Sequence, residues 1–253
     1  MIQVENLTKQ YKSKTSVKVV VDHNTWTAED GSITGFIGHN GAGKTTTLKM
    51  MTGILRPSDG RVLLNGKDIQ KDPFEAKKQF GYVSDSPDHF LRLKGEEYLN
   101  FVADVYGVPS SKRVPFIKEY SERLGIQDAM GSTILSYSHG MRQKIMLMGA
   151  LIHEPSIWIL DEPLTGLDPQ AAYELKKMMA EHVAKGNSVL FSTHVLEVAE
   201  KLCDKIVIIK KGVLQYDGTL DALRAKYPQD MSLEEIFLDI NGLLDTNEDE
   251  KHE

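Results

Sequence analysis

The chain has 253 residues, of which 41% are hydrophobic, and this suits one large globular domain or two small ones. Its formal net charge of −6 gives no electrostatic attraction to nucleic acid or to anionic lipid. The single cysteine, Cys203, excludes an internal disulfide, and neither a ~20-residue apolar span nor a signal peptide is found. We therefore expect a soluble protein that binds no nucleic acid and reaches a membrane only through a protein partner.

The N-terminal part predicts a small antiparallel β layer. Val4–Leu7 and Val17–Val21 have the composition of short strands. Arg61–Leu64 and Lys67–Ile69 predict a hairpin, because the intervening Asn65-Gly66 suits a type I′ turn.

The middle of the chain alternates short buried strands with helices. The predicted strands are Ile33–Ile37, Phe80–Val83, Trp158–Leu160 and Ser188–Phe191. The predicted helices are Thr45–Gly53, Lys144–His153, Pro169–Lys185 and Val195–Leu202. Such alternation predicts an α/β fold in which crossover helices cover a parallel sheet.

Two further regions complete the expected organisation. Residues 88–140 are mainly helical in pattern, which predicts a helical subdomain inserted in the α/β core. Lys205–Ile209 and Val213–Tyr216 predict a closing hairpin, and Ser232 with Glu235 forms a capping box. We therefore predict a single domain over residues 1–225, a short helix within 226–240, and an acidic disordered tail over 241–253.

A phosphate-binding loop is predicted between the strand Ile33–Ile37 and the helix after it. The segment Gly38–Thr45 matches G-x-x-x-x-G-K-[ST] in the strand–loop–helix setting that the motif requires. Its glycines let backbone N–H groups point at phosphate oxygens, Lys44 neutralises the β- and γ-phosphates, and the Thr45 hydroxyl can ligate Mg²⁺. A merely structural turn is the alternative. The residues expected to bind nucleotide here are Gly38, His39, Asn40, Gly41, Ala42, Gly43, Lys44, Thr45 and Thr46.

Two acids follow the strand that ends at Leu160. Asp161 is suited to hold Mg²⁺, while Glu162 is the candidate to orient and deprotonate an attacking water. His194 follows the next strand, Ser188–Phe191, and can reach the same crevice because parallel strands end at one edge of a sheet. The alternative is a strand that simply ends in a polar turn.

Ser138 precedes an apolar helix and has two interpretations. It is suited to cap that helix, and together with Gly140 it also gives the helix an anion-binding N-terminus.

The nucleotide-binding subunits of ABC transporters carry similar motifs in the same chain order. In this chain the motifs are Gly38–Thr45, Ser138 with Gly140, Asp161 with Glu162, Asp168 and His194, and the resemblance extends from Tyr11 to about Leu223. The resemblance implies a P-loop NTPase core that hydrolyses ATP with Mg²⁺, in a head-to-tail dimer with a second copy or a related subunit. In such a dimer each ATP lies between the P-loop of one subunit and the signature segment of the other.

The resemblance also implies roles for individual residues. Tyr11 is similar to the aromatic residue that stacks on adenine, and Asp168 to the acid of the D-loop. Ser138 and Gly140 are similar to the signature residues that contact the γ-phosphate across the dimer, and His194 to the switch histidine.

Two positions depart from the family pattern. His139 stands where the signature has its first glycine, and Asp85 stands where the Q-loop has glutamine. We predict that Asp85 senses Mg²⁺ through a water molecule, the alternative being that it caps the loop Ser84–Pro87 as an Asx-turn.

The variant signature and the acidic Q-loop resemble the ABC-2-type exporter ATPases, such as those of bacitracin and daunorubicin resistance and the Ecs-like systems. This implies a peripheral subunit on the cytoplasmic face of the membrane, bound to a separate integral membrane permease. We expect the permease to dock on Asp85–Tyr106, with Phe90 and Leu91 exposed; Tyr98 and Phe101 have helical spacing and could equally pack inside the subdomain.

The alternatives are a soluble ABC ATPase of a non-transport system, such as iron–sulfur assembly, and a phosphate-binding module without turnover, against which Glu162 argues.

Overall fold

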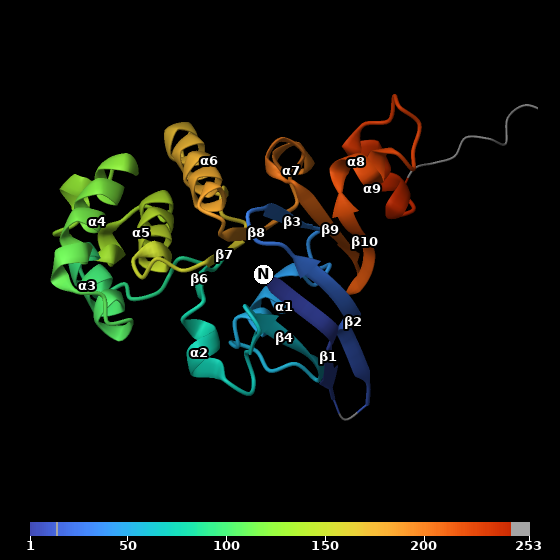
Figure 1. Ribbon diagram of the computed structural model, residues 1–253, viewed down its shortest axis with the longest axis horizontal. Helices are drawn as coiled ribbons and strands as arrows, with labels where there is room; N and C mark the ends of the chain where they lie inside the picture. Colours follow the sequence, from blue (N-terminus) through green and yellow to red (C-terminus); the bar gives the residue numbers. More distant parts are fainter. Residues whose placement is uncertain (14, 244–253) are drawn as a thin grey trace, which may run out of the picture.

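The computed structural model describes residues 1–13 and 15–243, and its strands form two sheets (Figure 1). The smaller sheet is antiparallel, with strand order β2-β1-β4-β5. Its strands are β1 (Ile2–Lys12), β2 (Val17–Ala28), β4 (Asp59–Leu64) and β5 (Lys67–Asp68). The β4–β5 turn has positive φ at both Asn65 and Gly66, as a type I′ turn requires. The antiparallel N-terminal layer is therefore confirmed, although β1 and β2 extend into polar sequence beyond the predicted apolar segments.

The larger sheet has the order β10-β9-β3-β8-β7-β6, in which all neighbours are parallel except β9 and β10. Its strands are β3 (Ile33–Ile37), β6 (Phe80–Val83), β7 (Ile157–Asp161), β8 (Ser188–Thr193), β9 (Lys205–Lys210) and β10 (Val213–Thr219). Every residue of β3, β7 and β8 is buried, and β3 and β7 are mostly apolar, as expected for strands that are covered on both faces. The predicted parallel sheet is thus confirmed.

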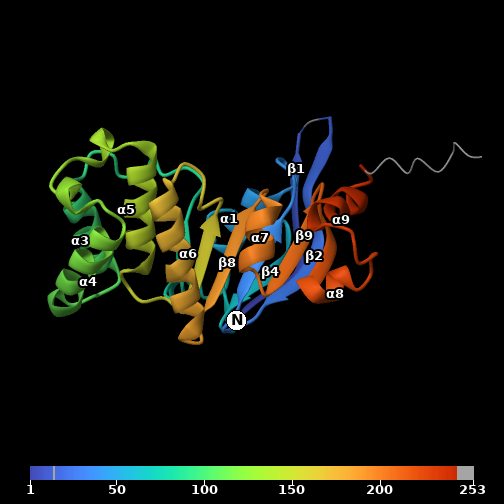
Figure 2. The same cartoon turned by 90° about the horizontal axis from the view of Figure 1, so that it is seen from above.

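Helices cover both faces of the larger sheet. Within the described ranges they are α1 (Lys44–Met51), α2 (Pro73–Lys77), α3 (Gly95–Val105), α4 (Ser110–Arg123), α5 (His139–Leu151), α6 (Pro169–Ala184), α7 (Leu196–Leu202), α8 (Leu220–Arg224) and α9 (Leu233–Ile240). α6 and α7 lie on one face, whereas α1 and the smaller sheet lie on the other (Figure 1). Figures 1 and 2 show α3, α4 and α5 gathered at one end of the molecule and α8 and α9 at the other. This arrangement agrees with a helical insertion in an α/β core.

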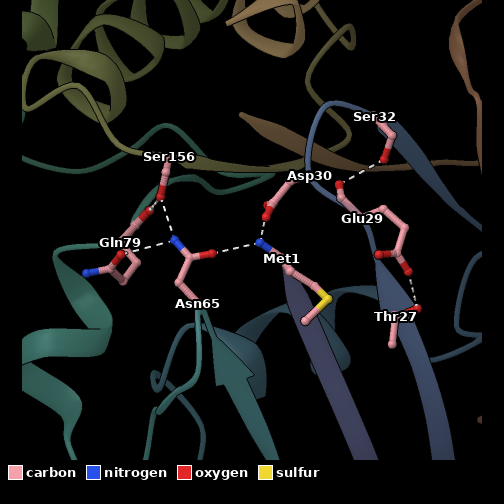
Figure 3. A network of polar contacts seen from close by, with 8 residues as sticks. All are labelled: Met1, Thr27, Glu29, Asp30, Ser32, Asn65, Gln79 and Ser156. Atoms are coloured by element: carbon pink, nitrogen blue, oxygen red, sulfur yellow. Dashed lines mark hydrogen bonds and ion pairs between the residues drawn. The ribbon is translucent and has the colours of Figure 1, made fainter. Parts of the chain in front are cut away.

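A polar network at the turn between β4 and β5 joins the two sheets (Figure 3). The side-chain amide of Asn65, in the β4–β5 turn, donates to Gln79 Oε1 at 3.1 Å and to Ser156 Oγ at 2.7 Å. The Met1 ammonium donates to Asn65 Oδ1 at 2.7 Å and also contacts the Asp30 carboxylate. The hairpin turn is thereby fixed to the loops that precede β6 and β7.

The C-terminal region is packed as far as Asn241, whose side-chain amide is buried and donates to the Phe237 carbonyl at 2.6 Å. The predicted disordered tail over 241–253 lies outside the described residues from 244 onward. Among the described residues no helix has the length and apolar character needed to span a membrane.

Candidate functional site

The loop after β3 lines a cavity of about 350 Å³. Gly41 and Gly43 have positive φ, and a Cβ on Gly43 would lie 2.8 Å from the Val20 carbonyl oxygen, so this position requires glycine. The Ala42 N–H donates to the His39 carbonyl at 3.0 Å. The residues that line the cavity are Lys18, Val20, His39, Asn40, Gly41, Gly43, Lys44, Thr45, Thr46, Asp85 and Glu162.

Lys44 holds its ammonium group inside this loop. The side chain is only 6% exposed, and Nζ donates to the Gly38 carbonyl at 2.7 Å. Nζ also lies 3.4 Å from Glu162 Oε1. The Lys44 ammonium therefore lies at the N-terminus of α1. Its positive charge and the helix dipole both attract an anion to this point.

Asp161 is fully buried at the end of β7. Its Oδ1 accepts a hydrogen bond from Ser192 Oγ at 2.5 Å. Burial raises the pKa of Asp161, while the hydrogen bond from the Ser192 hydroxyl and the nearby Thr45 hydroxyl act in the opposite direction.

The oxygen atoms of Asp161 and Thr45 are suited to bind a magnesium ion. Oδ2 of Asp161 is buried without a partner among the described residues, and the Thr45 hydroxyl is adjacent. No group of three or more His, Cys, Asp and Glu side chains suited to a metal occurs in the part of the chain that the structure describes. Mg²⁺ typically takes one or two protein oxygens and completes its shell with phosphate and water, which is the kind of set found here.

Glu162 and His194 are brought together by the neighbouring strands β7 and β8. Glu162 Oε2 lies 3.0 Å from His194 Nδ1. The Glu162 backbone has a φ of 48° and its N–H donates to Ser192 Oγ at 3.0 Å. A left-handed conformation costs a non-glycine residue about 1–3 kcal/mol, and strain of this kind is often found at functional sites. In this site the strained residue is Glu162, whose carboxylate lies between Lys44 and His194.

Asp85 lines the same cavity, in the loop after β6. The Ser84 hydroxyl donates to Asp85 Oδ1 at 3.0 Å, and the Ser86 N–H donates to Ser84 Oγ at 3.3 Å. The alternative that Asp85 forms an Asx-turn is therefore wrong. Ser84 caps this turn, and Pro87, two residues after Asp85, has no N–H to donate.

The signature segment lies at the N-terminus of α5. Ser138 caps the helix by accepting from the Met141 N–H at 3.3 Å, so α5 begins at His139, five residues before the predicted Lys144. His139 has no positive φ, which means that the freedom of a glycine is not needed there. A Cβ on Gly140 would lie 2.7 Å from the Gly166 carbonyl oxygen. Neither Ser138 nor Gly140 lines the cavity at the P-loop.

The D-loop is tied to the signature helix within the same chain. Asp168 caps α6 by accepting from the Ala171 N–H at 2.8 Å, and its Oδ2 lies 2.8 Å from Lys144 Nζ. The Lys144 ammonium is the main cause of the lowered pKa of Asp168. The His139 ring packs on Gly166, so the two segments are fixed relative to one another.

Sequence reasoning missed three contributors to the site. Lys18 and Val20 on β2 line the cavity, and Ser192 bridges the two acids. Tyr11 is the β1 partner of Lys18, is 48% exposed and is not among the lining residues.

A P-loop between a parallel strand and a helix, with acids at the end of a nearby parallel strand, is the arrangement of P-loop nucleoside triphosphatases. Within that class the chain belongs to the ABC transporter family, whose sequence model matches residues 21–165. It is an ATP-binding ATPase of that family.

The similarity to individual family members extends over most of the chain. The ABC-type transporter ATP-binding protein EcsA of Bacillus subtilis (strain 168) is 36% identical over 258 residues, covering 100% of this chain and 99% of EcsA. The bacitracin transport ATP-binding protein BcrA of Bacillus licheniformis is 33% identical over 227 residues, covering 89% of this chain and 72% of BcrA. A solved ATP-binding subunit of an ABC transporter has a TM-score of 0.89 at 32% identity and covers 95% of this chain and 99% of that one.

Proposed function

We propose that the chain is the ATP-hydrolysing motor subunit of an ABC exporter, bound to a separate permease at the cytoplasmic face of the membrane. The observation that carries this proposal is the convergence of Lys44, Asp161, Glu162 and His194 on one loop at the sheet edge. The full-length similarity to EcsA and the bacitracin transport function in the name of BcrA support the transporter assignment.

Each side chain has a part in the proposed reaction. The Lys44 ammonium neutralises the β- and γ-phosphates as negative charge develops. Glu162 accepts a proton from the attacking water, and His194 holds the Glu162 carboxylate in place. Thr45 and Asp161 would hold Mg²⁺, which supplies electrostatic stabilisation of the phosphate oxygens. Tyr11, next to Lys18, is proposed to stack on adenine.

The signature residues require a second subunit in this proposal. Ser138 and Gly140 lie outside the P-loop cavity of their own chain, so they can contact a γ-phosphate only across an interface. We propose a head-to-tail dimer in which they do so, and in which Asp168 fixes the D-loop at that interface.

The permease is proposed to dock beside α3. Phe101, Val105 and Tyr106 line an apolar cavity of about 260 Å³ between α3, β6 and α5. Phe90 is 47% exposed and its ring centroid lies 5.7 Å from that of Phe101, also 47% exposed. Together with Phe90, these residues form an exposed apolar patch suited to an apolar segment of a membrane protein.

The docking surface predicted from sequence needs one correction, and one alternative that it left open is resolved. Leu91 is partly buried against the core rather than exposed, because its carbonyl accepts from the Leu135 N–H and its side chain packs inward. Tyr98 is buried whereas Phe101 is exposed, so only Phe101 of that pair belongs to the patch.

We predict that Val105→Glu abolishes co-purification with the permease without lowering the melting temperature by more than about 2 °C, since surface substitutions rarely exceed ±0.5 kcal/mol. Val114→Glu on α4 is the matched control, because both valines are 65% exposed. Affinity purification from solubilised membranes provides the measurement. A complex that survives Val105→Glu, or that Val114→Glu disrupts equally, would place the docking surface elsewhere. Recovery of the wild-type chain without any membrane protein would favour the soluble, non-transport alternative.

We predict that Asp85→Asn retains Mg·ATP binding and most basal hydrolysis but loses stimulation by the assembled permease. The reason is that Asp85 lines the cavity at the start of the segment that leads to α3, and a contact through water tolerates an amide. ATPase activity in reconstituted vesicles, with and without permease, measures this. Unchanged stimulation would assign Asp85 to the loop structure alone, and complete loss of Mg²⁺-dependent binding would make it a direct ligand.

A further inference from the structure

Helix α9 shares a hydrophobic cluster with the end of β3, the strand that leads into the P-loop. Its buried residues Leu233, Ile236 and Phe237 belong to one hydrophobic cluster with Ile37, the last residue of β3. Figure 2 shows α9 beside β9, at the end of the molecule opposite to α3 and α4. Because Gly38 follows Ile37 directly, α9 supports the loop at the point where it leaves the sheet.

One contact reaches the loop itself. The ring centroids of Phe237 and His39 lie 4.8 Å apart with planes tilted by 56°, a favourable geometry for an aromatic pair. The His39 carbonyl accepts from the Ala42 N–H at 3.0 Å and from Lys44 Nζ at 3.4 Å. A restraint on the His39 ring therefore acts on the residue whose carbonyl helps to orient the Lys44 ammonium.

The β9–β10 turn holds the same loop from a second side. The Gly212 N–H donates to the Ala42 carbonyl at 2.8 Å, and the Gly212 carbonyl accepts from the Asp22 N–H at 2.9 Å. A Cβ on Gly212 would lie 2.3 Å from the Val20 carbonyl oxygen, so only glycine fits. Lys210 Nζ lies 3.5 Å from the Ile240 carbonyl, which joins this hairpin to α9.

We propose that Phe237 of α9 is a positioning residue for ATP, acting through His39. Phe237 lies well beyond residues 21–165, the part of the chain that the family model matches. Phe237 is not among the residues that line the cavity, and the Glu162 carboxylate is held by Lys44 and His194. Loss of the Phe237 ring should therefore weaken nucleotide binding more than it slows the chemical step, because the proposed base Glu162 keeps its own contacts.

The test uses full-length variants and measures the ATP Kd by calorimetry together with KM and kcat. Phe237→Ala should raise Kd and KM by about 3- to 10-fold and leave kcat within about 2-fold, as expected for the loss of one aromatic contact. Phe237→Tyr keeps the ring and should restore the wild-type KM. Leu233→Ala is the control, because Leu233 is buried on the same helix and in the same cluster but provides no ring for His39.

A double-mutant cycle with His39→Ala tests whether Phe237 acts on ATP binding through His39. If Phe237 acts through His39, the two substitutions together should raise KM no more than the larger single effect. Additive effects, an unchanged KM in Phe237→Ala, or an equal rise of KM in Leu233→Ala would overturn the proposal. If Phe237→Ala does not fold, Phe237→Leu replaces it in the same cycle with the same criteria. Absence of ATP binding by the wild-type chain would instead contradict the nucleotide site itself.

Discussion

Lys44→Ala is expected to weaken Mg·ATP binding by about 100-fold or more, since the charged hydrogen bonds and Coulomb attraction that it removes are worth roughly 3 kcal/mol. The ammonium lies at the start of α1 with its Nζ 2.7 Å from the Gly38 carbonyl, inside the loop that would surround the phosphates. Its neighbours are the Gly38 and His39 carbonyls and the Glu162 carboxylate, none of which can replace its positive charge. Calorimetric titration with Mg·ATP measures the effect.

Lys49→Ala is the control for this variant, because Lys49 is in the last turn of the same helix and does not line the cavity. It should bind Mg·ATP with the wild-type Kd. A wild-type Kd in Lys44→Ala would mean that the loop does not bind the phosphates in the way described.

Glu162→Gln is expected to bind Mg·ATP normally and to hydrolyse it about 10²- to 10⁴-fold more slowly, because an amide can hydrogen-bond water but cannot accept its proton. Gln keeps the shape of the side chain between Lys44 and His194. If hydrolysis opens the proposed dimer, the variant should also accumulate as an ATP-bound dimer. Single-turnover hydrolysis and light scattering measure the two effects.

Glu197→Gln is the matched control, since this exposed acid on α7 pairs only with Lys201 among the described residues. It should behave as the wild-type chain does. Near-normal turnover in Glu162→Gln would mean that another group, with His194 the nearest candidate, takes the proton.

The sequence was sufficient to predict the P-loop and the acids because both depend on local signals. The run Ile33–Ile37 is buried at every residue, and the motif after it restricts the backbone strongly. Asp161 ends β7 and His194 follows β8 directly. These two strands are adjacent and parallel in the sheet, so the proximity of the two residues follows from the alternation of strands and helices. The roles of these residues remain predictions, as does the division of the chain at residue 225.

Other parts of the site depend on tertiary packing and could not be read from sequence. Lys18 and Val20 line the cavity because β2 lies over the loop, where Gly212 allows a close backbone approach. The contact between His39 and Phe237 joins residues almost 200 positions apart, and neither segment carries a signal for it. The exposure of Phe101 and burial of Tyr98 likewise depend on how α3 packs against α5.

This chain is proposed to hydrolyse ATP with Glu162 as the base. The most direct test of this proposal is phosphate release from Mg·ATP by the wild-type chain and by Glu162→Gln, purified side by side and followed at saturating ATP. Phosphate release is expected to require Mg²⁺ in the wild type and to be reduced by at least about 100-fold in the variant. Equal release by the two proteins, or release that does not depend on Mg²⁺, would contradict it.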